Sequence, residues 1–254
     1  MRTPPARAAL CWLLMVAGAW SAGPTRAGNL QAAPISIEIA AGEQSQTLTL
    51  TNTGDTPLRA QVRVMDWRQS GGVEDLLPAR TLRASPPIVE IAPRSQQLVR
   101  IVRPDRTPPA TELAYRLIVD ELPDPEQADV AGLKLLLRYS IPVFVLPPGV
   151  VPVLARTGNI PPTDLSVVTA TLHGDRLEVA NNGTSRIRIS DVAWVNTDGS
   201  VVPIHPGLLG YALAGQRMQW PLPLPAGART GGSLRARFNN DPDAQALALD
   251  RPGR

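Results

Sequence analysis

Cysteine and histidine are scarce in this sequence of 254 residues, and each shortage argues against a class of function. The one cysteine, Cys11, lies in an amino-terminal apolar run, so a chain that loses this run has no thiol for a disulfide or for nucleophilic catalysis. His173 and His205 each stand at a turn, beside Gly174 and Pro206, with no cluster of acids or thiols around them. Two such histidines make a poor zinc or iron site. We therefore expect a protein that is not an enzyme and that holds no metal and no cofactor.

The sequence also lacks helical periodicity after residue 30, and it has no excess of basic residues once its first 27 residues are set aside. Those residues contain three arginines and no acid, which leaves 22 basic residues against 22 acidic ones. A chain without net charge gives no reason to expect binding to nucleic acid or to a membrane surface. Its 27 prolines and 20 glycines favour short strands joined by turns over long helices.

Residues 1–27 have the pattern of a signal peptide for export. Arg2 and Arg7 precede an apolar run over Ala8–Ala19, which is too short to span a bilayer, so we expect no membrane insertion. Cleavage after Ala27 fits the small residues that a signal peptidase requires, and an earlier site within residues 21–27 is an alternative.

Short runs of alternating apolar and polar residues recur through the chain. In residues 35–39, for example, isoleucines at every second position alternate with polar residues. Such runs give about seven strands over residues 30–147, the number typical of an immunoglobulin-like sandwich. Pro147–Gly149 then marks a boundary, after which a second set of alternating runs begins. We predict an all-β protein with two immunoglobulin-like β-sandwich domains, residues 28–147 and 148–254.

The stretch from Gly132 to Pro148 carries an apolar row at the end of the first predicted domain. One face of this strand holds Leu133, Leu135, Leu137 and Tyr139, and the other holds Lys134, Leu136, Arg138 and Ser140. The row either fills the core of its own domain or is held out for another chain. The alternation alone leaves both interpretations open.

Several segments, taken together in their order and spacing, resemble one family over essentially the whole chain after residue 27. They are residues 48–54, Trp67, residues 85–87, residues 97–101, residues 115–123 and residues 141–145. This set resembles the periplasmic chaperones of the chaperone-usher pathway, which assemble pili and fimbriae. The pattern of Tyr115–Leu117 followed by Asp120–Pro123 is similar to the alternative or archaic branch of these chaperones.

The resemblance implies two immunoglobulin-like domains set at an angle and a function without chemistry. A member of this family works in the periplasm, lends a strand to an incomplete pilus or fimbrial subunit, and delivers that subunit to an outer-membrane usher. The resemblance assigns the role of donor-strand residues to Leu133, Leu135 and Leu137, and Tyr139 continues their row. Self-capping as a homodimer is possible. The alternative is a secreted two-domain adhesive or structural module.

The sequence departs from the best-known branch of this family at the residues that bind the subunit's terminal carboxylate. Two basic residues are expected there, and Ser36 and Pro142 stand at those positions. Because Tyr115 and Leu117 are expected to point inward, Arg116 should point outward near the hinge. We therefore expect Arg116 to be the carboxylate anchor, with Arg100 or Arg138 as helpers; the alternative for each is a solvated strand arginine.

Two further positions carry expectations about packing. Trp67 and Trp194 are expected to pack in or beside the two cores. Glu112 stands where the family has an acid of an interdomain charge network, but Ala110 and Thr111 replace the acid and base expected just before it. The sequence therefore leaves the presence of that network open.

Overall fold

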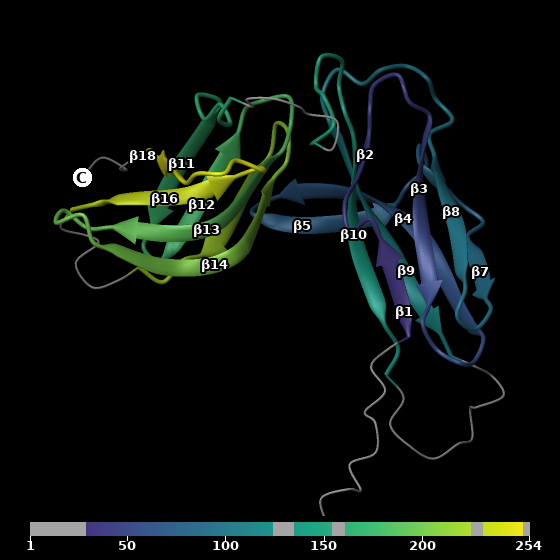
Figure 1. Ribbon diagram of the computed structural model, residues 1–254. Helices are drawn as coiled ribbons and strands as arrows, with labels where there is room; N and C mark the ends of the chain where they lie inside the picture. Colours follow the sequence, from purple (N-terminus) through teal and green to yellow (C-terminus); the bar gives the residue numbers. More distant parts are fainter. Residues whose placement is uncertain (1–28, 124–134, 154–160, 225–230, 251–254) are drawn as a thin grey trace, which may run out of the picture.

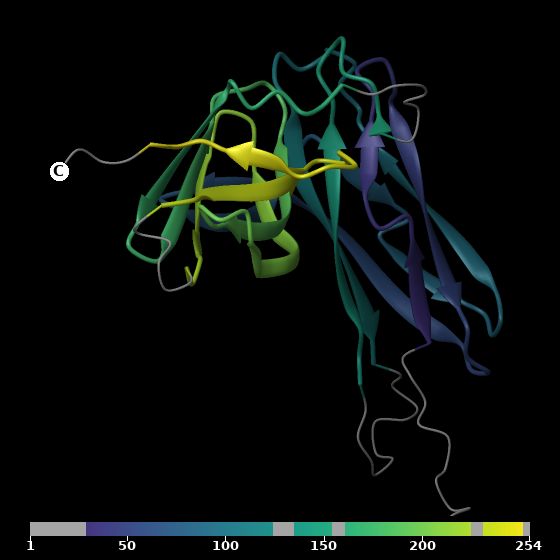
Figure 2. The same ribbon diagram turned by 60° about the vertical axis from the view of Figure 1, so that its left-hand side comes forward.

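The computed structural model describes residues 29–123, 135–153, 161–224 and 231–250, which form two β-sandwiches (Figure 1). The strands of the two sandwiches run in clearly different directions when the molecule is turned (Figure 2). The predicted all-β fold with two sandwiches set at an angle is therefore confirmed. The expected signal peptide and Leu133 lie outside the described residues.

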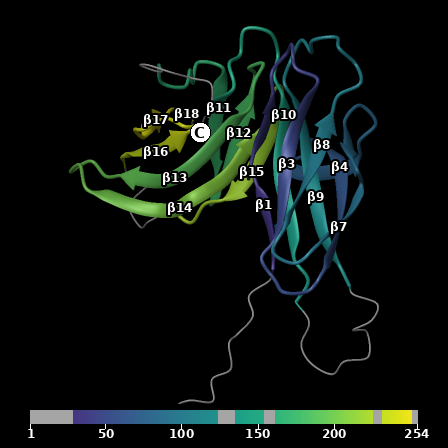
Figure 3. The same ribbon diagram turned by 45° about the vertical axis from the view of Figure 1, so that its right-hand side comes forward.

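The first sandwich consists of two sheets that face one another, as Figure 3 shows from the side of β3 and β8. One sheet has the order β1 (Leu30–Ala33), β3 (Ser45–Asn52), β8 (Gln96–Val102), β6 (Arg83–Ser85). The other has the order β2 (Ile37–Ile39), β10 (Arg138–Val145), β9 (Leu113–Leu122), β4 (Leu58–Ser70), β5 (Val73–Pro78), and β7 (Ile88–Ile91) also pairs with β4. All pairings are antiparallel except that of β2 with β10.

The second sandwich also has two sheets. The first has the order β15 (Arg217–Pro221), β12 (Arg176–Asn181), β11 (Val168–His173), β18 (Leu249–Asp250). The second has the order β14 (Val201–Ala212), β13 (Ile187–Val195), β16 (Ser233–Phe238), β17 (Gln245–Leu247). The change from one sandwich to the other falls between β10 and β11.

Strict alternation builds the first core. In β3, Leu48 and Leu50 are fully buried while their neighbours are partly exposed, so one face of the strand enters the core. Asn52 continues this buried row, and its amide donates to the carbonyl oxygens of Thr56 and Ile91 at 2.8 and 3.0 Å. A buried polar group with its bonds made costs little and fixes the end of the sandwich.

A long hairpin joins the two domains. Strands β4 and β5 reach from the first sandwich toward the second (Figure 1), and Gly72 at their turn bridges to Met218 in β15. Gln69 donates from its side chain to the carbonyl oxygen of Tyr211 at 2.6 Å and accepts from the amide of Leu213 at 2.9 Å. Beside these bonds, Trp67 packs in an apolar cluster that both domains share. The predicted burial of Trp67 is confirmed, and the residue serves the junction between the domains.

Trp194 occupies a different place. It is buried in the core of the second sandwich, as expected. Its indole lies so close to Gly232 that a Cβ at that residue would come within 2.5 Å of the indole nitrogen, and Gly232 has a φ of 112°. Both observations explain the glycine, because no other residue would fit the space or the backbone conformation.

Candidate functional site

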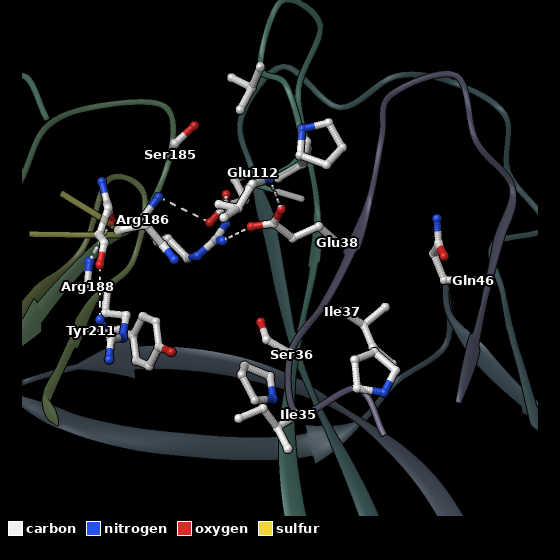
Figure 4. A pocket seen from close by; sticks show the side chains of 18 of the residues that line it. Ile35, Ser36, Ile37, Glu38, Gln46, Glu112, Ser185, Arg186, Arg188 and Tyr211 are labelled. Carbon is white, nitrogen blue, oxygen red and sulfur yellow. Dashed lines mark hydrogen bonds and ion pairs between the residues drawn. The ribbon is translucent and has the colours of Figure 1, made fainter. Parts of the chain in front are cut away.

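A cleft of about 870 Å³ lies between the two domains. The first domain contributes residues around β2, β9 and β10, and the second contributes residues at the start of β13 and in β14. Figure 4 shows Ser36 in the middle of this space, with Tyr211, Arg186 and Arg188 on the side of the second domain. The cleft thus places polar and charged groups of both domains around one volume.

Arg116 lies in this cleft, in the orientation that the sequence predicts. Its strand neighbours Tyr115 and Leu117 are buried in the first core, so the Arg116 side chain emerges on the outer face of the sheet. Strand pairing sets Arg116 opposite Pro142 in β10. Its guanidinium lies 3.6 Å from the centre of the Trp67 ring. Stacking on an aromatic face holds the planar cation while leaving its N–H groups at the edge.

The Arg116 guanidinium has almost no partner of its own. The side chain is only 16% exposed, and the one ion pair that it forms with a described residue is a 3.9 Å contact with Glu74. No hydrogen bond from its side chain occurs among the described residues. Burial lowers the pKa of Arg116 and the Glu74 carboxylate opposes that shift, but an arginine remains charged. A cation that is mostly buried without hydrogen bonds is costly, which is typical of a site that a ligand completes.

The two expected helpers do not join Arg116. Arg100 lies in β8, in the other sheet of the sandwich, where its side chain is exposed. Arg138 lies in β10 four residues before Pro142 and forms an ion pair with Asp120. Neither residue lines the cleft. Neither expected helper therefore lies in the cleft with Arg116.

The predicted apolar row of β10 is partly packed into its own domain. Leu135 is 67% exposed, whereas Leu137 and Tyr139 are half-buried against the first core. The Tyr139 hydroxyl donates to the carbonyl oxygen of Leu30 at 2.6 Å. The described strand begins only at Arg138, although the Leu137 carbonyl still accepts from the amide of Glu121 at 2.9 Å. The core interpretation therefore applies to Leu137 and Tyr139, and Leu135 does not pack into the core of its own domain.

One edge of β10 is only half paired. Along β9, the pairing runs from Arg138 to Val145. On the opposite edge, β2 pairs with Val143–Val145 alone, so residues 138–142 have no strand partner on that side among the described residues. An unpaired edge offers N–H and C=O groups to an incoming strand.

An interdomain charge network is present although the sequence left it open. Arg186, which precedes β13, forms ion pairs with Glu38 of β2 and with Glu112, and the second pair measures 2.6 Å. Its guanidinium also lies 3.6 Å from the centre of the Phe144 ring. Figure 4 shows the two carboxylates converging on Arg186. Glu38 and Arg186 carry no sequence signal of their own, because only the docking of the two domains brings them together.

Burial sets the electrostatics of this network. The Glu112 side chain is 1% exposed, and this desolvation raises the pKa of its carboxyl against the opposing effect of Arg186. The backbone amide of Arg186 also donates to the Glu112 carboxylate, at 3.1 Å. Glu112 is therefore a buried acid whose charge depends on a single arginine.

The stability of the protein should depend on pH through Asp120 of β9, which pairs with Arg138 at the start of β10. Burial raises the pKa of its carboxyl, but hydrogen bonds from Arg63 and Arg138 outweigh burial and lower the pKa overall. A lowered folded-state pKa gives stability that is present above the unfolded value, about 3.9, and is lost as the pH falls through the folded value. We expect Asp120→Asn to reduce the free energy of unfolding at pH 7 by about 1 kcal/mol, and this difference to shrink as the pH falls below about 4. Urea unfolding at pH 7 and pH 3 measures this; a difference as large at pH 3 as at pH 7 contradicts it.

The described residues show little sign of other chemistry. No group of three or more histidines, cysteines or acids in them is placed to hold a metal ion. In the same part of the chain, no helix has the length and apolar character needed to cross a membrane.

The comparisons with known proteins point to one family. Residues 29–151 match the family model of the pili and flagellar-assembly chaperone, PapD N-terminal domain. No curated protein matches the chain.

Solved structures share the fold over both domains. In the CsuC–CsuE chaperone-tip adhesion subunit pre-assembly complex of the archaic Csu pili of Acinetobacter baumannii, the matching chain is 22% identical with a TM-score of 0.65, covering 88% of this chain and 99% of that one. A chain of the Salmonella enterica SafA pilin–SafB chaperone complex is 20% identical with a TM-score of 0.60, and the match covers 85% of this chain and 91% of that one. The Pseudomonas aeruginosa CupB2 chaperone is 19% identical with a TM-score of 0.59, and the match covers 87% of this chain and 100% of that one. The likeness in fold thus extends over both sandwiches. Because the family model matches residues 29–151, the first sandwich of this chain belongs to the family of pili and flagellar-assembly chaperones.

Proposed function

We propose that this pilus assembly chaperone works in the periplasm, binds pilus or fimbrial subunits by donor-strand complementation and delivers them to an outer-membrane usher. The observation that carries this proposal is the edge of β10 that the described strands pair only in part, beside a cleft with a cation that forms no hydrogen bond to a described residue. The family membership favours a binding role rather than catalysis. Two of the similar structures are named as complexes of a chaperone with a tip adhesion subunit or a pilin, which supports a subunit as the partner.

The β10 edge explains how a subunit is held. An incoming strand pairs with the main chain of residues 138–142, and exposed Leu135 reaches into the groove of an incomplete sandwich. Burying a leucine contributes about 1.5–3 kcal/mol before the costs of ordering. Exposed strand edges also favour self-association, so the same edge supports a self-capping homodimer of the free chaperone.

Arg116 explains where the bound strand ends. Arg116 lies opposite Pro142 in the strand pairing, at the hinge end of the half-paired edge, and its guanidinium stacks on Trp67 in the cleft. We expect a strand that runs along β10 to end in this cleft, within reach of that guanidinium. A terminal carboxylate there receives two hydrogen bonds from the fork of the guanidinium. In this protein, the carboxylate anchor thus moves from β10, where Pro142 stands, to the neighbouring strand.

Substituting Arg116 tests this function. We expect Arg116→Gln to lower the yield of subunit that copurifies from periplasmic co-expression by about 10- to 100-fold, since a hydrogen bond to a charged group is worth about 1.5–3 kcal/mol. The matched control is Arg100→Gln, an exposed strand arginine away from the cleft, which should leave the yield unchanged.

Two outcomes would overturn the proposal at different levels. Equal yields for Arg116→Gln and the unaltered protein would remove Arg116 as the anchor. A protein found outside the cell that captures no subunit would instead favour a secreted adhesive or structural module.

A further inference from the structure

We propose that Arg188 of the second domain is a second arm of the anion site, so that the terminal carboxylate is bound between one arginine from each domain. This inference rests on the proposed function and names a residue that the sequence gives no reason to select. It also defines the ligand more closely, as a free carboxyl terminus whose last side chain is apolar.

Tyr211 brings the two arginines into one neighbourhood. Arg188 in β13 stands directly opposite Tyr211 of β14 in the strand pairing. From the first domain, the Arg116 guanidinium lies 5.9 Å from the centre of the Tyr211 ring. Both arginines line the same cleft, and Figure 4 shows Arg188 beside Tyr211, below Arg186.

Arg188 keeps most of its binding capacity unused. Its Nη1 group donates to the carbonyl oxygen of Asn239 at 2.9 Å and lies 3.5 Å from the Ser190 hydroxyl. Its Nε and Nη2 groups donate no hydrogen bond to a described residue. No carboxylate of the described residues forms an ion pair with it, although Arg186, two residues earlier, has two. A cation at an interdomain surface that is not neutralised by its own protein favours an anionic ligand.

The acids of the cleft are already engaged elsewhere. Glu38 and Glu112 both pair with Arg186. Glu43 accepts hydrogen bonds from the amide of Ala40 and from Gln46. Arg116 and Arg188 are therefore the cations of the described cleft that remain for a ligand, with only the long contact to Glu74 competing for the first.

The apolar wall of the cleft distinguishes a peptide terminus from a small inorganic anion. Ile35 of the first domain is 79% exposed and Leu208 of the second is 46% exposed, and both line the cleft. An inorganic anion gains nothing from such residues, whereas an apolar terminal side chain buries them. The ligand that fits this site is thus a carboxylate next to an apolar group.

Paired peptides test this assignment. The probe is an acetylated peptide of alternating threonine and valine that ends in phenylalanine, made once with a free carboxylate and once with a terminal amide. Binding to the full chain is followed by calorimetry and by intrinsic tryptophan fluorescence, to which Trp67 beneath Arg116 contributes. We expect the free acid to bind about 10- to 100-fold more tightly than the amide.

Variants then separate the two arginines. Arg188→Gln should lower the ratio of the affinity for the free acid to the affinity for the amide about tenfold, as the loss of one charge-assisted hydrogen bond predicts. Arg188→Lys should retain part of it, which keeps the test usable if the glutamine variant folds poorly. The control Arg176→Gln, an exposed arginine of β12 remote from the cleft, should change nothing.

The outcomes distinguish this inference from the function on which it rests. If Arg188→Gln keeps the full preference while Arg116→Gln loses it, Arg188 only ties β13 to the loop at Asn239, and the proposed function stands. If the unaltered protein shows no preference, or binds neither peptide, the carboxylate anchor itself is wrong.

Discussion

Replacing Leu135 with aspartate should abolish subunit capture while leaving the chaperone folded. The side chain is 67% exposed in the free protein, so the change costs its own fold little. In a complex by strand donation, the same side chain enters an apolar groove, where a carboxylate loses the leucine contribution and is buried without a partner. We expect the capture of a co-expressed subunit to fall by at least about a hundredfold, which a pull-down from periplasmic extract measures.

The neighbouring leucine provides a matched control. Leu136 is 50% exposed and lines a shallow pocket together with Arg63 and Arg138. Strand alternation assigns it to the face opposite that of Leu135. Leu136→Asp should therefore bind subunit about as well as the unaltered protein. Equal loss in both variants would indicate a general effect of charge near residue 135. Unfolding of Leu135→Asp would instead show that the row serves the core of its own domain.

Replacing Arg186 with glutamine should be the most damaging single change to the junction between the domains. Its loss leaves Glu112, 1% exposed, as a buried carboxylate without a cation. Removing one partner of a buried ion pair typically costs about 3–5 kcal/mol. We expect a loss of this size in the free energy of unfolding in urea at pH 8. Small-angle scattering should also show a wider spread of shapes, because Glu38 no longer ties the first domain to the second.

The cost of losing Arg186 should depend on pH with a definite sign. Burial already raises the pKa of Glu112, and without Arg186 it rises further. A group with a raised folded-state pKa stabilises the fold most below its unfolded value, about 4.3, and loses this contribution as the pH rises through the folded value. The Arg186→Gln variant should therefore recover stability between pH 8 and pH 5. Adding Glu112→Gln should remove that recovery; a deficit that is constant with pH would contradict the buried-acid explanation.

Alternation predicts the fold because burial on one face imposes it. In β3, Leu48 and Leu50 alternate with polar residues in the sequence, and both are buried in the core. The orientation of Arg116 follows from the same rule, since Tyr115 and Leu117 on either side must point inward. Local pattern thus determines both the strands and the face on which a side chain emerges.

Contacts between distant segments are harder to predict. Alternation does not determine in which sheet a strand lies. For this reason Arg100 is expected from the sequence as a possible helper of Arg116, although β8 and β9 belong to opposite sheets. Arg186 pairs with Glu38, and Arg116 meets Tyr211, only where the two domains contact one another. No periodicity within one domain encodes that geometry.

The hairpin of β4 and β5 bears on how fast a subunit is captured. Because Gln69 bonds to the backbone of Tyr211 and Leu213, and Gly72 bridges to Met218, the two walls of the cleft are already fixed in the free protein. An incoming strand then meets a preorganised receptor and loses no free energy to a hinge motion. Association should accordingly proceed in a single concentration-dependent phase, limited by encounter and by strand registration rather than by domain closure.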